Sequence, residues 1–156
     1  MPPLTLRSPH RDRIRQLVVV VAAALLLAGC LSPAAKPIAP GGPLDQAHDV
    51  AAKALLQRAV TAANVHLAES GSWQGFDAAA GARFDPLIRW QMGGEPPVEA
   101  VSILPASATD VQLVTRSRSG SFFCAHGAAA TGAFGYGAGE AFAQVDTPAE
   151  CAEPLL

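Results

Sequence analysis

The chain of 156 residues has few charged and few aromatic side chains, and it contains only three cysteines. Charged residues make up 15% of the sequence and aromatic residues 6%, and the net charge at pH 7 is −2. A nucleic-acid-binding protein usually presents a basic face, so we expect no nucleic-acid partner. Hydrophobic residues make up 50%, which excludes a wholly disordered chain. Thirteen prolines and fourteen glycines argue against a simple helical bundle.

The sequence also has no apolar run of the length that a membrane-spanning helix needs. Its longest run, residues 17–28, has 12 residues, whereas a helix that crosses the hydrocarbon core needs about 20. The preceding 16 residues contain four arginines and one aspartate and carry a charge of +3. A basic start, a short apolar centre and small residues behind it are typical of a secretory signal peptide. We therefore assign residues 1–29 to a signal peptide and expect an exported protein.

The end of this segment reads Leu27-Ala28-Gly29-Cys30. These residues resemble the lipobox of bacterial lipoproteins, in which a lipid is attached to the cysteine thiol and cleavage leaves that cysteine as the first residue. The resemblance implies that Cys30 carries acyl chains such as palmitate and anchors the protein to the extracytoplasmic face of the cell membrane. Each buried methylene contributes about 0.8 kcal/mol, so two or three chains hold firmly. An ordinary signal peptide and an uncleaved anchor are the alternatives.

Residues 30–43 follow as a tether. They contain four prolines and two glycines without an apolar period, and a polyproline-like segment of this length spans roughly 40 Å at about 3.1 Å per residue. From Cys30 onward the chain has seven basic and twelve acidic residues. Since anionic headgroups attract clusters of lysine and arginine, we expect the domain that follows to stand away from the membrane.

The domain, residues 44–156, is predicted to start with an amphipathic helix over residues 50–70. Asp45 or Asp49 can cap its start, and Gly71 suits the left-handed position after its end. Apolar side chains recur along the helix at a spacing that places them on one face. They are Ala52, Leu56, Ala59, Val60, Ala63 and Leu67.

The second half of the chain has β-prone segments at residues 98–104, 110–115 and 119–125, separated by turn residues. A short helical turn is expected before Pro86. The segment 132–139 reads GAFGYGAG, which is too rich in glycine to be expected inside a strand. One long helix followed by a small antiparallel sheet predicts an α+β fold.

Several short motifs resemble, in their order along the chain, the globular domain of type IV pilin-like and pseudopilin-like proteins. An alanine-rich helix is followed by Glu69-Ser-Gly-Ser, then by Trp73 and by Gly-Phe at 75–76. Downstream, RSRSGSFFCAHG at 116–127 resembles the strand of such domains that carries a cysteine, and a Tyr-Gly pair at 136–137 precedes a late cysteine. The resemblance covers about residues 47–151 and implies a pilin-like fold.

The same resemblance implies a disulfide between Cys124 and Cys151. Such bonds persist in an exported chain, and lipidation of Cys30 would account for the third cysteine. Bonding would hold the two Cα atoms about 4.4–6.8 Å apart. It would place residues 147–153 beside the strand 119–125 and leave residues 128–142 as a surface excursion. Two separately buried thiols are the alternative.

The resemblance does not extend to the features that place such proteins in filaments. Pilins and pseudopilins carry a Gly-Phe cleavage site before the apolar segment and a glutamate five residues later. Here the boundary reads Gln16-Leu17-Val18, and residues 14–44 contain no acidic residue. Cleavage at the lipobox would also remove the apolar segment. The sequence therefore favours a pilin-like fold without filament membership.

No motif predicts a metal, a cofactor or catalysis. Zinc sites use paired spacings of cysteine and histidine, which Cys124, His126, His48 and His66 do not provide. The glycine-rich segment lacks the lysine and the spacing of a phosphate-binding loop, and no G-x-S-x-G is present. We therefore expect no cofactor, no metal ligand and no catalytic residue.

The densest aromatic cluster consists of Trp73, Phe76, Phe84 and Trp90. We interpret it as part of the core beside the helix, because aromatic side chains dominate cores. An exposed Trp90, close to Pro96 and Pro97, is the alternative and would offer a contact surface.

Together these features favour a lipid-anchored binding or structural protein of the cell envelope without catalytic activity, with protein partners in the envelope. The alternative is an accessory subunit of a secretion or pilus-type machine that keeps its N-terminal helix as a membrane anchor.

Overall fold

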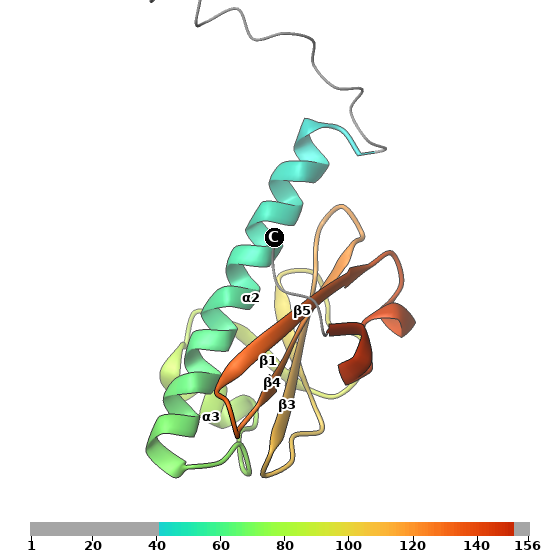
Figure 1. Ribbon diagram of the computed structural model, residues 1–156. Coiled ribbons are helices and arrows are strands. Elements are labelled where there is room, and N and C mark those ends of the chain that lie inside the picture. The colour runs from blue at the N-terminus through green and yellow to red at the C-terminus, as the bar shows by residue number, and fades with distance from the viewer. Residues whose placement is uncertain (1–40, 152–156) are drawn as a thin grey trace, which may run out of the picture. The chain divides into compact units, whose positions relative to one another are not determined.

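The computed structural model describes residues 41–151 (Figure 1). The predicted signal peptide, the lipobox with Cys30 and nearly all of the tether lie outside the described residues, as does the segment 152–156. Within the described range, no helix is both long and apolar enough to cross a membrane.

The fold consists of one long helix and a five-stranded sheet. The helices are α2 (Pro43–Ser70) and α3 (Ala78–Phe84), and the strands are β1 (Arg89–Met92), β2 (Ala100–Leu104), β3 (Asp110–Arg116), β4 (Phe122–Ala128) and β5 (Ala133–Gly139). Two 3-10 helices, η1 (Phe142–Gln144) and η2 (Pro148–Cys151), complete the described chain. The strands lie side by side in chain order. The predicted α+β class is confirmed.

The sheet is mixed rather than antiparallel. Strands β2 to β5 pair antiparallel, but β1 pairs parallel to β2, with Arg89 opposite Ala100. Residues 93–99 must therefore run back along the sheet, and the turn that starts this return has Gly93 and Gly94 at φ of 64° and 70°. The expectation of a purely antiparallel sheet was wrong because no strand was expected at residues 89–92, and the strand that forms there pairs parallel to β2.

The long helix begins earlier than predicted and ends where expected. Pro43, which we assigned to the tether, is its first residue, a position where a missing N–H costs nothing. Asp45 contributes to capping from within the first turn, since its carboxylate accepts a hydrogen bond from the N–H of Gly42 at 3.2 Å. At the other end, Gly71 has φ 73° and donates its N–H to the carbonyl of Leu67 at 2.8 Å.

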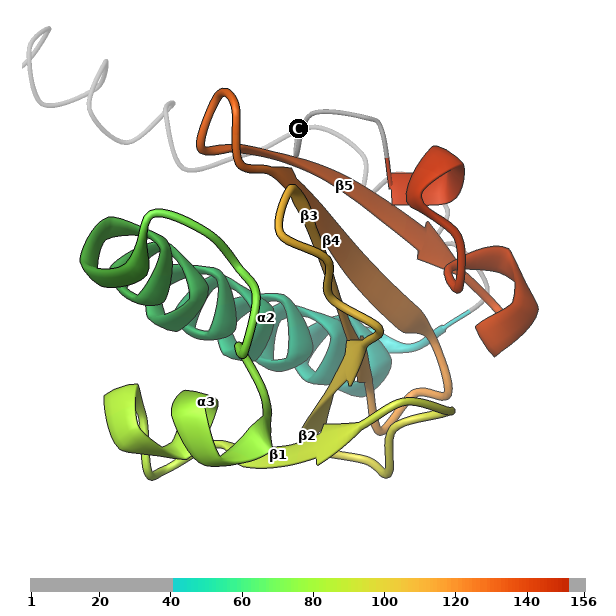
Figure 2. The ribbon, with the colours of Figure 1, turned by 90° about the horizontal axis from the view of Figure 1, so that it is seen from below.

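Helix α2 lies across one face of the sheet, and η1 and η2 lie on the other (Figure 2). Five of the six predicted apolar positions of the helix are buried, and Leu67 is half-buried. Trp73 and Phe76 fill the end of this core, with 0% and 1% of their surfaces exposed. The indole N–H of Trp73 donates to the carbonyl of Ala63 at 3.2 Å, so the buried polar group is satisfied. The interpretation of these two aromatic residues as core is confirmed.

A second, smaller core on the opposite face contains the two expected cysteines. The structure places the sulfurs of Cys124 and Cys151 at bonding distance, with 5.8 Å between their Cα atoms. Both residues are fully buried. The buried side chain of Gln112 donates to the carbonyl of Val145 at 2.7 Å and so fixes the segment before η2. The C-terminal segment therefore lies over β4, as expected.

The glycine-rich segment is a strand, so the expectation of a surface excursion over residues 128–142 was wrong. Phe134 and Tyr136 of this strand pack against the helix-side core. On the other face, a Cβ added at Gly137 would collide with the backbone of Glu150 and lie 3.0 Å from the sulfur of Cys124. The glycine thus allows η2 and the disulfide to approach the strand closely, a use of glycine in strands that composition alone does not reveal.

Candidate functional site

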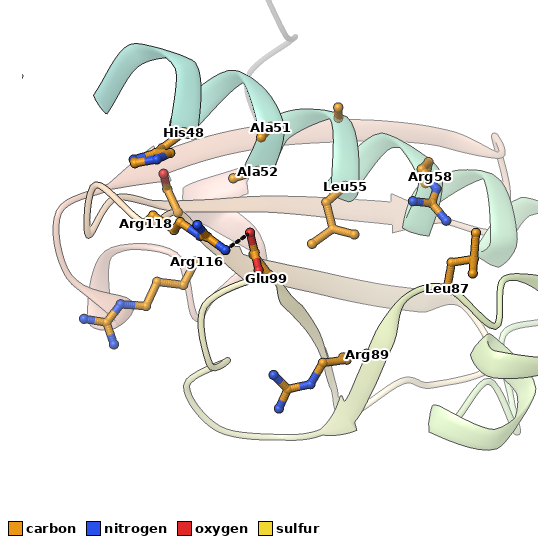
Figure 3. Close-up of a pocket in the computed structure, with 12 residues that line it drawn as sticks. His48, Ala51, Ala52, Leu55, Arg58, Leu87, Arg89, Glu99, Arg116 and Arg118 are labelled. Carbon is orange, nitrogen blue, oxygen red and sulfur yellow. Dashed lines mark ion pairs between the residues drawn. The ribbon is translucent and has the colours of Figure 1, made fainter. Parts of the chain in front are cut away.

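A groove of about 590 Å³ lies between the first half of α2 and the part of the sheet around β1 and the ends of β2 and β3 (Figure 3). Its floor, on the side of α2, consists of apolar residues that include Ala51, Ala52 and Leu55. Leu87, just before β1, closes one end and is 82% exposed.

The groove collects most of the positive charge of the described domain. Six basic residues occur in residues 41–151, and they are Lys53, Arg58, Arg83, Arg89, Arg116 and Arg118. All but Lys53 and Arg83 line the groove, together with one carboxylate, that of Glu99. The same range of the chain contains eleven acidic residues. The lining of the groove is therefore richer in basic residues than the rest of the described domain.

Three of these arginines have carboxylate partners. Arg58 makes a two-pronged contact with Asp85, at 2.6 to 3.0 Å. Arg116 pairs with Glu95 at 2.8 Å, and Arg118 with Glu99 at 2.8 Å. The last pair is the most exposed of the three, with 57% and 64% of the two side chains accessible. Exposed pairs of this kind contribute about 0 to 1 kcal/mol.

Arg89 differs from the other three. Its guanidinium has no carboxylate within 4.0 Å in the part of the chain that the structure describes. It projects from the edge strand β1, on the wall of the groove opposite α2 (Figure 3). An unpaired guanidinium offers five N–H donors to a carboxylate or phosphate.

The carboxylate of Glu99 is held by an unusual backbone. Glu99 has a backbone φ of 60°. Among the described residues, all the others with a positive φ are glycines. This left-handed conformation costs a residue with a Cβ roughly 1 to 2 kcal/mol. Such outliers persist where the surrounding structure fixes them and are frequent at binding sites. Here the conformation directs Glu99 toward Arg118 (Figure 3).

Two nitrogen atoms of the lining residues are shielded from water and lack a hydrogen-bond partner within residues 41–151. They are Nδ1 of His48 and Nε of Arg116. Most buried polar groups in proteins are satisfied. The guanidinium of Arg116 lies over the ring of Phe122, which belongs to the second core, so the two atoms do not face one site.

The residues considered for a metal site at the sequence level do not come together. His66 packs in the core with its ring 5.3 Å from that of Phe76. His126 lies on β4 beside Asp110, with Nε2 and Oδ1 3.3 Å apart, and Cys124 is in the disulfide. Across residues 41–151, no three histidine, cysteine, aspartate or glutamate side chains are arranged to hold a metal ion.

Asp110 itself belongs to a polar turn at the start of β3. The hydroxyl of Thr109 donates to its carboxylate at 2.6 Å, and Ser107 donates at 3.3 Å. The bond from Thr109 is the main reason that the pKa of Asp110 is lowered, and Ser107 and the neighbouring His126 add to the effect. The turn stabilises the β3 start and lies apart from the groove.

Trp90 is not the exposed contact residue that we considered as an alternative. It is half-buried, its ring packs edge-on against Phe76 at 5.8 Å, and its indole N–H donates to the carbonyl of Asp85 at 3.0 Å. A Cβ added at Gly81 would lie 2.6 Å from Cδ2 of Trp90, so the ring packs closely against this glycine. The structure instead has a groove lined by arginines, which the sequence analysis did not predict. The feature of the sequence that could have drawn attention to these arginines is the small number of basic residues after residue 40.

Comparison of the chain with models of protein families, with curated proteins and with solved structures finds no match.

Proposed function

We propose that the chain is a lipid-anchored protein of the bacterial envelope, with a pilin-like domain that binds another envelope component and catalyses no reaction. The observation that carries the binding role is the groove, which gathers Arg58, Arg89, Arg116 and Arg118 over an apolar floor. The anchor rests on the lipobox at residues 27–30. The pilin-like relationship is supported by the order of one long helix, an antiparallel run of strands and a disulfide near the end of the domain.

The composition of the groove favours binding over catalysis. Among residues 41–151, Glu99 is the one carboxylate that lines it, and it is paired with Arg118. In the part of the chain that the structure describes, His48 is the one lining histidine, and its Nδ1 is shielded. General acid–base chemistry needs such a group within reach of a reacting atom. Cationic side chains around an apolar floor instead suit recognition of an anionic ligand.

The anchor is tested by metabolic labelling with an acyl probe. The wild-type protein should incorporate the probe and sediment with membranes, and Cys30→Ser should lose the label. Continued labelling and membrane association of Cys30→Ser would refute lipidation at this residue.

A second candidate is an accessory subunit of a secretion or pilus-type machine that keeps its N-terminal helix as an anchor. It is favoured by exposed apolar side chains on the outer side of α2. Leu44 is 68% exposed, Val50 66% and Val65 40%. Exposed apolar residues on a helix can pack against another helix.

Site-specific photo-crosslinking in cells separates the two candidates. A photoreactive amino acid at position 87 reports on the groove, and one at position 50 reports on the outer side of α2. The first proposal predicts a discrete crosslinked product from position 87 and none from position 50. Products from position 50 alone, with other pilin-like subunits, would favour the machine subunit.

A further inference from the structure

We propose that the arginine groove binds an extended peptide segment in which carboxylate side chains alternate with apolar ones, and that Arg89 and Arg118 hold the carboxylates. The inference rests on the proposed binding function, which it makes specific by naming the chemistry of the partner. It does not depend on the lipid anchor.

The first argument is charge complementarity. The described domain has six basic and eleven acidic residues, yet four of the six basic residues line one groove. Three of these arginines bind carboxylates of the domain itself. A carboxylate of an acidic partner would make the same kind of contact. The planar guanidinium matches the geometry of a carboxylate, so the site is preformed for this group.

The second argument is the availability of two guanidinium groups. Arg89 has no carboxylate within 4.0 Å in residues 41–151. Arg118 contacts Glu99 through one nitrogen at 2.8 Å, and both side chains are more than half exposed. A carboxylate of a partner can therefore bind Arg89 directly and compete with Glu99 for Arg118. We therefore expect Glu99 to compete with the carboxylate of the partner for Arg118.

The dimensions and floor of the groove suit an extended segment. His48 and Arg58 mark its length along α2, and ten residues of helix rise about 15 Å. An extended peptide advances about 3.3 Å per residue, so four or five residues span this distance. Ala51, Leu55 and Leu87 provide apolar contacts for the side chains between the carboxylates.

An anionic membrane surface is the other source of negative charge near an anchored protein. The domain as a whole is acidic, with eleven acidic against six basic residues in the described range. A bilayer would face the domain surface around the groove as well as its floor, and an acidic surface is repelled by anionic headgroups. The concave shape and the acidic surroundings therefore favour a narrow peptide.

The test uses fluorescence anisotropy with the full chain in detergent. The probe is a fluorescein-labelled peptide of six residues, alternating leucine and glutamate, and the control probe has glutamine in place of glutamate. We expect binding of the acidic probe at concentrations below about 1 mM, weakening as salt is added, and at least tenfold weaker binding of the control probe. Equal binding of both probes, or no binding of the acidic one, would overturn the proposal.

Matched variants assign the binding to the groove. Arg89→Gln and Arg118→Gln should each weaken binding by about tenfold, the value of one charge-assisted contact. Arg83→Gln removes an arginine of α3 that is paired with Glu69 outside the groove, and it should change binding less than about twofold. Glu99→Gln removes the competitor and should strengthen binding. An equal loss in Arg83→Gln and Arg89→Gln would show that only net charge matters and would overturn the assigned site.

A sedimentation experiment with vesicles tests the alternative of a membrane surface. The Cys30→Ser variant, which lacks the thiol needed for lipidation, is sedimented with vesicles of phosphatidylcholine alone or with phosphatidylglycerol added. The proposal predicts no added sedimentation with phosphatidylglycerol. Sedimentation that depends on Arg89, without peptide binding, would replace the peptide with a lipid headgroup. If neither the peptide nor the vesicles bind, the peptide proposal fails, but the result of acyl labelling at Cys30 is unaffected. The proposal of a binding groove and the proposal of a lipid anchor can therefore fail independently.

Discussion

Reduction of the Cys124–Cys151 disulfide should lower the melting temperature of the domain by about 14 °C. The bond spans 27 residues, and in the chain-entropy model closure of a loop of that size stabilises the folded state by about 3.5 kcal/mol. For a domain of about this size, 1 kcal/mol corresponds to roughly 4 °C. The loop includes β5 and both 3-10 helices, so the bond restrains much of the second core.

The assay compares thermal unfolding of the oxidised and reduced protein by circular dichroism, with reduction confirmed by thiol alkylation and mass. Both cysteines are fully buried. A reductant should therefore react slowly with the folded protein and faster after urea is added, because attack needs the sulfur to become accessible. The variant Cys124→Ala/Cys151→Ala should melt at or below the temperature of the reduced protein, since it also loses buried sulfur contacts. A fully reduced protein whose melting temperature falls by less than about 3 °C would refute the reasoning.

Three further substitutions test the packing and one polar turn. Trp73→Ala should lower the free energy of unfolding by about 3–5 kcal/mol in urea titration, because it leaves a large cavity and removes the hydrogen bond to Ala63. Gly137→Val should leave free thiols after oxidative refolding, since its side chain occupies the space of the C-terminal segment; complete disulfide formation would contradict the close approach. Asp110→Asn should be less stable than wild type at pH 6, and the difference should shrink as the pH falls below about 4. The bond from Thr109 lowers the pKa of Asp110 in the folded state, so its stabilisation is present above the unfolded pKa and lost as the carboxylate is protonated. A difference that does not change between pH 6 and pH 3 would contradict this.

The features that the sequence predicted well depend on local patterns. The apolar face of α2 and its end at Gly71 follow from spacing and from a residue that tolerates a left-handed backbone. Strands β2 and β3 coincide with β-prone segments between turn residues. The short helix α3 starts at a capping aspartate, Asp77, whose carboxylate accepts the N–H of Ala80 at 2.8 Å.

The features that were missed depend on contacts between distant segments. Strand β5 looked too rich in glycine, because the reason for Gly137 is the segment around Glu150 that packs on it. The parallel pairing of β1 depends on a return of the chain that no residue of β1 encodes. The groove escaped prediction for the same reason, since Arg58, Arg89 and Arg118 come from α2, β1 and the turn after β3.

The intact mass of the protein extracted from membranes tests the central claim most directly. The proposal of a lipid-anchored envelope protein predicts a mass equal to residues 30–156 plus two or three acyl chains. A mass that includes residues 1–29 without added lipid would contradict it and would support the subunit that keeps its N-terminal helix as an anchor.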